Sequence, residues 1–324
     1  MALTFPTADA AGATRDASVT TGPGGSLPVE GYVLGWGGGR AAYLDDAGTV
    51  DIAGVDGVEL TADADGVTAV PGAARPVLRA AHRHGDTAEL LVSNYSDAFG
   101  DFDPALAHRM LASPSHRRHV AADLARVVRR QGWDGIQIDL ESLAAHDRAG
   151  LSAFVQALRA AVPGRATLSM AVMAETSRAA YRRHGYGFAR LDAVDRFVLM
   201  AYDEHGPGWS GPGPIGALTW ARRTVRPLID AVGAGRVDLG IAGYGYLWTS
   251  ADAGHSVSDA KARHLASGQA VWHRRAGEWT AHVARGTLWW SDGRSYRRRL
   301  ALAHDLGVHG VAVWQLGSAD PLRG

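Results

Sequence analysis

The chain has 324 residues, and its 33 basic and 33 acidic side chains give a formal net charge of zero. This balance supplies no global field that would attract nucleic acid or an anionic membrane surface. Cysteine is absent, which excludes disulfides, thiol nucleophiles and cysteine zinc sites. The sequence has no apolar run of 18 residues, so no membrane span is predicted. Its first residues lack a signal-peptide pattern; a trimmed secreted protein would look the same, so the compartment stays open.

Residues 1–28 are rich in Ala, Gly, Thr and Asp without a period, which predicts a flexible N-terminal arm. Beyond them, short runs rich in Val, Ile and Leu alternate with segments of helical spacing. The expected strands are 30–36, 49–55, 88–95, 135–141, 166–173, 196–203, 237–244 and 309–316. Alternation of strand and helix over this length predicts parallel βα units, and eight strands favour an α/β protein with a closed (β/α)8 TIM barrel over an open doubly wound sheet.

Two of the intervening segments have clear helical periodicity, residues 104–132 and 147–164. In the second, Asp147 suits a helix N-cap, and Pro163-Gly164 suits a stop. Residues 247–293 are too long for a simple connection before the last strand. They contain one helical pattern and three short alternating runs, which predict a small α+β insertion. The expected domains are therefore a barrel of residues 29–246 and 294–324 and an insertion of residues 247–293.

The most informative stretch is "GIQIDLE", residues 135–141, where apolar and polar residues alternate. Because side chains at i, i+2 and i+4 of a strand share one face, Gln137, Asp139 and Glu141 lie on the same side. In a barrel this side faces inward, and Glu141 comes at the C-terminal rim, where barrel enzymes place their chemistry. Two carboxyls this close do not both ionise freely, so the pKa of one rises and it can act as a general acid. Cleavage of a glycosidic bond requires such a pair.

With Asp134 before it, the strand resembles the signature of glycoside hydrolase family 18, Asp-Gly-x-Asp-x-Asp-x-Glu. "LMAYD", residues 199–203, is similar to the Met-x-Tyr-Asp of that family, and "GVAVW", residues 310–314, is similar to its last strand. The insertion has the place and size of the family's α+β insertion. The resemblance covers roughly residues 30–320 and is nearest to the bacterial branch that acts on peptidoglycan and spore cortex glycans.

The resemblance implies a role for each matching residue. Glu141 protonates the glycosidic oxygen and later activates water, while the substrate's own 2-acetamido oxygen attacks the anomeric carbon. Asp139 holds that acetamide and Tyr202 donates a hydrogen bond to its carbonyl. The remaining substrate contacts are expected from Met200, Asp203, Trp314 as the apolar floor, Gln137, and Tyr244, which with Tyr246 alternates on the seventh strand and could line the cleft wall.

Gln137 departs from the family pattern, because most chitinases carry an Asp there. An amide cannot accept a proton in the relevant pH range, but it can donate a hydrogen bond to Asp139. An Asn often occupies this place in the peptidoglycan-directed branch, so Gln137 is interpreted as a variant of that branch. Trp209, in the turn-rich loop after Asp203, either contacts a sugar or packs that loop.

No cofactor or metal is expected. The pairs His82-x-His84 and His116-x-x-His119 fall in helical surface patterns, and the zinc motif His-Glu-x-x-His does not occur. The Arg182-Arg183 and Arg297-Arg298-Arg299 runs are interpreted as solvated faces rather than phosphate sites.

The sequence thus predicts a retaining glycoside hydrolase of β-linked N-acetylglucosamine polymers, with peptidoglycan ahead of chitin. The expected partner is a glycan, with no nucleic acid, no membrane span and a monomeric chain. The resemblance suggests a secreted or wall-associated protein. Two alternatives remain: a lectin-like barrel without catalysis, and an endo-β-N-acetylglucosaminidase that acts on N-glycans.

Overall fold

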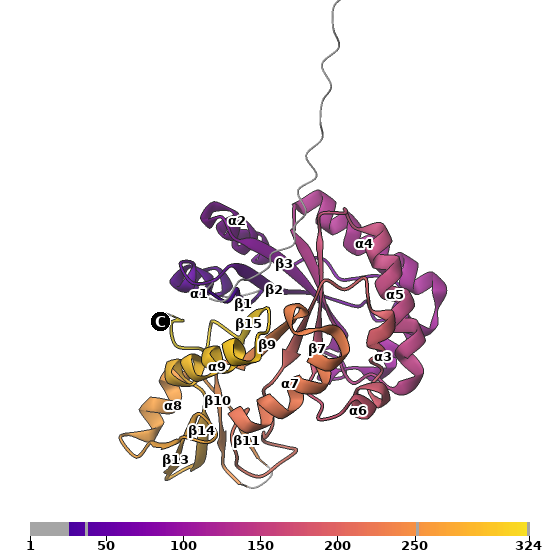
Figure 1. The fold of residues 1–324 in the computed structure, drawn as a ribbon. Coiled ribbons are helices and arrows are strands. Elements are labelled where there is room, and N and C mark those ends of the chain that lie inside the picture. The colour runs from indigo at the N-terminus through magenta and orange to yellow at the C-terminus, as the bar shows by residue number, and fades with distance from the viewer. Residues whose placement is uncertain (1–25, 36–37, 251–252, 323–324) are drawn as a thin grey trace, which may run out of the picture.

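The computed structural model describes residues 26–35, 38–250 and 253–322, and its main feature is a closed barrel of eight parallel strands (Figure 1). Around the barrel the strands follow the order β1(Val29–Leu34), β15(Gly310–Trp314), β9(Val237–Ala242), β8(Arg196–Met200), β7(Thr167–Met173), β6(Gly135–Asp139), β3(Thr87–Ser93) and β2(Ile52–Glu59). These are the strands predicted from the sequence, which confirms the (β/α)8 barrel. Most of the expected N-terminal arm, residues 1–25, lies outside the described residues.

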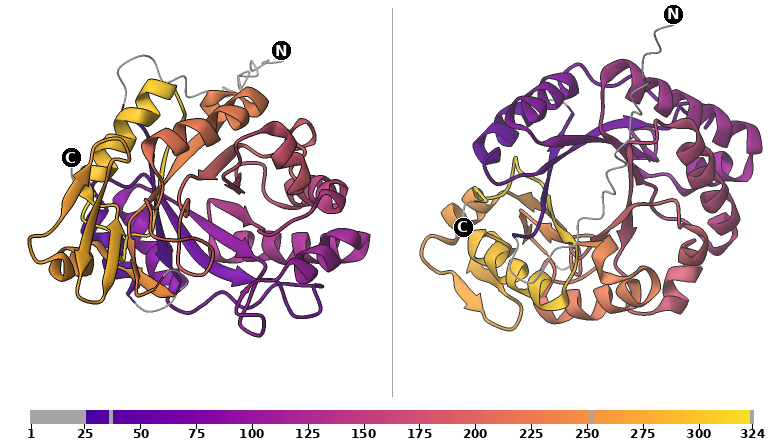
Figure 2. Two further views of the ribbon diagram at one scale, coloured as in Figure 1. Left: turned by 90° about the horizontal axis from the view of Figure 1, so that it is seen from below. Right: turned by 45° about the horizontal axis from the view of Figure 1, so that its top comes forward.

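Helices cover the outside of the barrel, as the right-hand view of Figure 2 shows along the barrel. They are α1(Gly39–Asp46), α2(Ala74–His84), α3(Pro104–Ala112), α4(Pro114–Gln131), α5(Arg148–Ala161), α6(Arg178–Arg183), α7(Leu218–Val232) and α9(Gly293–Leu306), with short 3-10 turns η1(Ala145–Asp147), η2(Phe188–Arg190) and η3(Ala234–Arg236). None of the described helices has both the length and the apolar character that a bilayer span requires.

The periodic segment 104–132 forms two helices rather than one. Ser113 has extended backbone angles, and its side chain accepts a hydrogen bond from the backbone N–H of His116. Pro114 follows at the first position of α4, where its missing N–H is not needed. Since proline disfavours helical geometry in the residue before it, the chain turns at Ser113 although the apolar spacing continues.

The insertion is a second, five-stranded sheet beside α9, in the order β11(Gly254–Val257), β10(Gly245–Trp248), β14(Gly286–Trp290), β13(Glu278–Val283), β12(Val271–His273). Helix α8(Asp259–Ala266) packs on it, and the two share a small apolar core that includes Leu247, Leu288 and Trp290. The sequence analysis missed β10 and β11. Barrel strand β9 ends at Ala242, so the assignment of Tyr244 and Tyr246 to the seventh strand was wrong, and Tyr246 lies in the insertion sheet.

A buried ion pair ties this insertion to the barrel. The guanidinium of Arg299, on α9, contacts Glu278 on β13 and is only 1% exposed. Glu278 also accepts hydrogen bonds from the backbone N–H groups of Ile215 and Gly216, at 2.7 and 2.9 Å, and thereby fixes the loop that precedes α7. The interpretation of Arg299 as a solvated surface residue was wrong, because a buried acidic partner compensates its charge.

A second buried charge cluster lies at the N-terminal end of the barrel strands. Arg196 on β8 donates to Glu30 at 2.6 Å and to Glu89 at 2.9 Å, and it also contacts Asp238. All four side chains are almost completely buried. Burial raises the pKa of Glu30 to about 7, although the Arg196 charge acts in the other direction.

Candidate functional site

Strand β6 positions the central carboxyls. Ile136 and Ile138 are fully buried in the apolar layer between barrel and helices, whereas Gln137 and Asp139 point into the barrel interior and are 1% and 9% exposed. Glu141 lies two residues past the end of β6 and is half-buried. The alternation along the strand therefore separates a structural face from a polar inner face.

Asp139 is a buried carboxyl with an unused acceptor. Its Oδ1 is inaccessible to solvent and has no hydrogen-bond partner among the described residues. Burial, followed by the charge of Asp56 on β2, raises its pKa from 3.8 to about 7. An unpaired buried acceptor is unfavourable for folding and is typical of a group that is satisfied only when a ligand binds.

We expect Asp139→Asn to become more stable relative to the wild type as the pH rises. Because the folded carboxyl has a raised pKa, its contribution to stability is present below about pH 4 and is lost as the pH rises through 7. The rise of the Asp139 pKa from 3.8 to about 7 corresponds to at most about 4 kcal/mol of stability. Urea unfolding of both proteins at pH 4.5 and pH 8 measures the difference. Replacement of the exposed Asp305 by Asn is the control, and a pH-independent difference for Asp139→Asn would contradict the expectation.

Glu141 is held through its backbone by an amide that the sequence analysis did not single out. The buried Asn94, directly after β3, accepts from the Glu141 N–H at 2.8 Å and donates to the Glu141 carbonyl at 3.2 Å. The next residue, Ser142, has a positive φ of 57°, so the chain turns sharply after the acid. Burial and the charges of Asp139 and Asp203 raise the pKa of Glu141 well above its usual value, which favours a protonated acid near neutral pH.

Tyrosines surround these acids on the side of β8. Tyr202 follows β8, and burial together with the charges of Asp139 and Glu141 raises its pKa, so its phenol stays protonated. Asp203 has a positive φ of 61°, and its Oδ1 accepts hydrogen bonds from Tyr244 at 2.6 Å and Tyr246 at 2.9 Å. Tyr246 therefore reaches the site from the insertion sheet.

Trp314, at the end of β15, lies between two cavities. The first, about 540 Å³, is lined by Asp139, Ser93, Tyr95 and Phe102, among others. The second, about 270 Å³, is lined by Asp203, Tyr244, Tyr246 and the insertion segment 256–258. Trp314 contributes to both walls and packs on Tyr32 with ring centroids 5.4 Å apart. Among the residues that the structure describes, Trp314 alone lines both cavities, and the two cavities together are called the cleft.

The suggested hydrogen bond from Gln137 to Asp139 is absent. The Gln137 amide donates instead to Glu30 and to Ser169, both at 3.0 Å, and its carbonyl accepts from Tyr32 at 2.6 Å. These partners lie deeper in the barrel than Asp139, and they satisfy the hydrogen-bonding groups of the Gln137 side chain. Its place in this network makes it a support beneath the cleft rather than a neighbour that neutralises Asp139.

Three further acids of the cleft were not predicted. Asp56 and Glu59 on β2 and the exposed Asp97 line the first cavity, and burial with the Glu59 charge raises the pKa of Asp56 to about 6. Asp56 and Glu59 lie in the C-terminal half of β2 and Asp97 lies in the loop after β4, and no sequence motif marks any of the three. Trp209 lies beside the second cavity. It is 58% exposed and packs edge-on against Tyr246, with ring centroids 6.0 Å apart. Met200, the last residue of β8, is half-buried.

A TIM barrel with two carboxyls of raised pKa at the end of one strand, beside cavities lined by aromatic rings, is the arrangement expected of a glycoside hydrolase. Residues 94–320 match the model of the glycosyl hydrolases family 18, which covers more than half of the chain. The chain therefore belongs to this family.

Curated relatives and solved structures agree with this assignment. Over 231 residues the chain is 27% identical to YdhD of Bacillus subtilis (strain 168), named as a candidate sporulation-specific glycosylase; this covers 67% of the chain and 55% of YdhD, so the chain spans little more than half of that relative. A chitinase from Chromobacterium violaceum ATCC 12472 superimposes with a TM-score of 0.82 at 25% identity, covering 91% of this chain and 96% of the chitinase. The spore cortex-lytic enzyme SleL of Bacillus cereus shares the fold, with a TM-score of 0.81 at 18% identity over 92% and 72% of the chains.

Proposed function

We propose that the protein is a retaining glycosidase that cleaves β-linked N-acetylglucosamine polymers by substrate-assisted catalysis, with the glycan strands of peptidoglycan as its substrate. The observation that carries this proposal is the Asp139 carboxyl, which lines the first cavity and whose charge helps to raise the pKa of Glu141. A carboxyl on the cavity wall can accept an acetamide N–H, and an acid with a raised pKa can give the proton that a glycosidic oxygen needs in order to leave.

In the proposed reaction, Glu141 donates its proton to the glycosidic oxygen as the bond to the anomeric carbon breaks. The acetamide oxygen of the same sugar forms a bond to that carbon, and the amide becomes an oxazolinium. Asp139 accepts the acetamide N–H, and its negative charge stabilises the cation. Tyr202, whose raised pKa keeps its proton, donates to the acetamide oxygen. Glu141 then takes a proton from water, which attacks the anomeric carbon from the original side as the bond from that carbon to the oxazolinium oxygen breaks. The acetamide is restored and the anomeric configuration is retained.

The remaining predicted contacts follow from the shape of the cleft. Trp314, shared by both cavities, supplies an apolar face for the sugar at the cleavage point. Asp203, held by Tyr244 and Tyr246, is proposed to bind hydroxyls in the second cavity, and Met200 to pack beneath. Two cavities on either side of Trp314 are consistent with a chain of several sugars.

Peptidoglycan is favoured over chitin by the branch that the motifs resemble and by the name of YdhD. The test is product analysis by mass spectrometry after incubation with purified peptidoglycan, chitin oligomers and an N-glycosylated protein in parallel. Peptidoglycan fragments with an N-acetylglucosamine reducing end are expected. Release from chitin or from the glycoprotein alone would replace the substrate assignment, and tight oligosaccharide binding without any product would favour the lectin alternative.

A further inference from the structure

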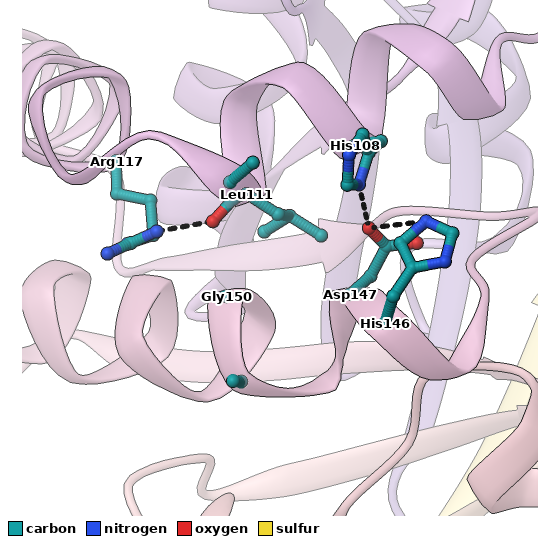
Figure 3. Close-up of a pocket in the computed structure, with 8 residues that line it drawn as sticks. His108, Leu111, Arg117, His146, Asp147 and Gly150 are labelled. Carbon is teal, nitrogen blue, oxygen red and sulfur yellow. Dashed lines mark hydrogen bonds and ion pairs between the residues drawn. The ribbon is translucent and has the colours of Figure 1, made fainter.

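A second cluster of chemically active side chains lies outside the cleft, on the outer surface near α3. His108 projects from α3, while His146 and Asp147 belong to η1. Together they line a surface cavity of about 240 Å³ (Figure 3). The η1 turn is part of the connection that leaves β6. Its last residue, Asp147, follows Glu141 by six positions in the chain.

The two imidazoles converge on one carboxylate oxygen. His108 Nδ1 lies 2.7 Å and His146 Nε2 lies 3.5 Å from Asp147 Oδ1, and the two rings stand nearly perpendicular with centroids 4.5 Å apart. Figure 3 shows both rings directed at this oxygen. One potential ligand atom from each of the three residues lies within 4.8 Å of the other two, and within the part of the chain that the structure describes no other three His, Asp or Glu residues meet this condition.

Asp147 does not perform the local role that its position suggests. It precedes α5, but its side chain does not cap that helix. Its Oδ2 accepts from the backbone N–H of Ala144 at 2.8 Å, which fixes the carboxylate, and the residue is 3% exposed. Asp147 is thus the N-cap residue of α5, as the sequence predicts, but its side chain makes no capping hydrogen bond, and its second oxygen faces the imidazoles.

Close packing holds the two halves of the cluster together. A Cβ added to Gly150, on the first turn of α5, would lie 2.3 Å from the carbonyl oxygen of Leu111 on α3. Only glycine permits this approach, which brings His108 over Asp147. Arg117 also lines the cavity, but its guanidinium is bound to the Leu111 carbonyl, and Figure 3 places it on the other side of Leu111 from the imidazoles.

We propose that His108, His146 and Asp147 bind one divalent transition-metal ion of the zinc type, with water as the fourth ligand. Metal–ligand bonds of about 2.0–2.1 Å in a tetrahedron separate ligand atoms by roughly 3.3 Å. The His146–Asp147 separation of 3.5 Å fits this value, and the His108–Asp147 hydrogen bond would open as the metal displaces its proton. Two imidazoles select Zn²⁺, Ni²⁺ or Cu²⁺ over Mg²⁺ and Ca²⁺.

The ion would cross-link α3, through His108, to the connection between Glu141 and α5, through His146 and Asp147. The fixed Asp147 carboxylate already has the outer hydrogen bond that orients metal ligands, from Ala144. The site is independent of the proposed substrate, because none of its residues lines either cavity of the cleft. Its expected effect is on the stability of this connection.

The test is calorimetric titration of the chelator-treated, full-length protein with Zn²⁺, with Co²⁺ absorption as a report on tetrahedral coordination. One equivalent of Zn²⁺ is expected to bind and to raise the melting temperature. His146→Ala removes an exposed ligand without disturbing the core and is expected to weaken binding by more than the 10- to 100-fold that loss of an outer-shell partner costs. His108→Ala should do the same, and zinc should no longer raise the melting temperature of either variant.

His119→Ala is the matched control. His119 Nδ1 lies 2.8 Å and His116 Nε2 lies 3.8 Å from Asp65 Oδ1, so this group has the same residue types as the proposed site. Its three ligand atoms do not, however, all lie within 4.8 Å of one another. The variant is expected to bind zinc like the wild type. The proposal fails if the wild type binds no stoichiometric zinc, if binding survives His108→Ala and His146→Ala unchanged, or if His119→Ala abolishes it.

Discussion

Replacing Glu141 by Gln is expected to lower kcat on the preferred glycan about 10²- to 10⁴-fold, the range that a positioned general acid contributes. Glutamine keeps the size and the hydrogen-bonding capacity of the side chain but has no proton to donate at working pH. The oligosaccharide affinity should change little, because the cleft walls remain. Initial rates and calorimetric binding of a chitin or peptidoglycan oligomer measure the two effects separately.

Glu59→Gln is the matched control, since Glu59 lines the first cavity together with Asp139 and undergoes the same change from carboxyl to amide. It is expected to keep most of the activity, because no proton transfer is assigned to it. Near wild-type cleavage by the Glu141→Gln protein would rule out the mechanism, whereas equal loss in both variants would indicate a general electrostatic effect of the cleft.

The second large effect is on folding. Replacing Arg196 by Met is expected to lower the free energy of unfolding by about 3–5 kcal/mol, the loss that follows when one partner of a buried ion pair is removed. Glu30, Glu89 and Asp238 would remain buried without their cation. Burial raises the pKa of Glu30 to about 7, and protonation of Glu30 relieves the repulsion among the three carboxyls, so the loss should be larger at pH 8 than at pH 5. Urea unfolding at both pH values measures it.

Arg126→Met provides the comparison. Arg126 pairs with Asp123 at 2.7 Å on the surface of α4, where the Arg side chain is 51% exposed, so its removal should change the stability by about 1 kcal/mol or less. Equal losses of unfolding free energy for Arg196→Met and Arg126→Met would show that the buried cluster contributes no more to the stability of the barrel than a surface ion pair does.

The sequence was most informative where a pattern is local. Periodicity of two located the barrel strands, and the alternation in residues 135–141 put Gln137 and Asp139 inside the barrel, because adjacent side chains of a strand must face opposite sides. Helix interruption at Ser113 and Pro114 was also readable in principle, since both residues act on their own backbone.

Contacts between distant segments were not readable in this way. Asn94 clamps the backbone of Glu141 across 47 positions, and Arg196 reaches Glu30 across 166 positions. Tyr246 was placed on the wrong strand because β10 continues the apolar alternation of β9 into another sheet. Arg299 was placed on the surface because its acidic partner lies on a strand of the insertion.

Local patterns in the sequence were therefore enough to predict the closed eight-stranded barrel and the inward face of β6, because backbone geometry imposes these periods on neighbouring residues. Three contacts became known only from the folded chain: Gln137 bonds away from Asp139, two tyrosines donate to Asp203, and His108 bonds to Asp147. Each of these depends on which strand or helix comes to lie beside another. Side-chain hydrogen bonds reach only about 3 Å, so closing the barrel creates them and no local pattern of residues records them.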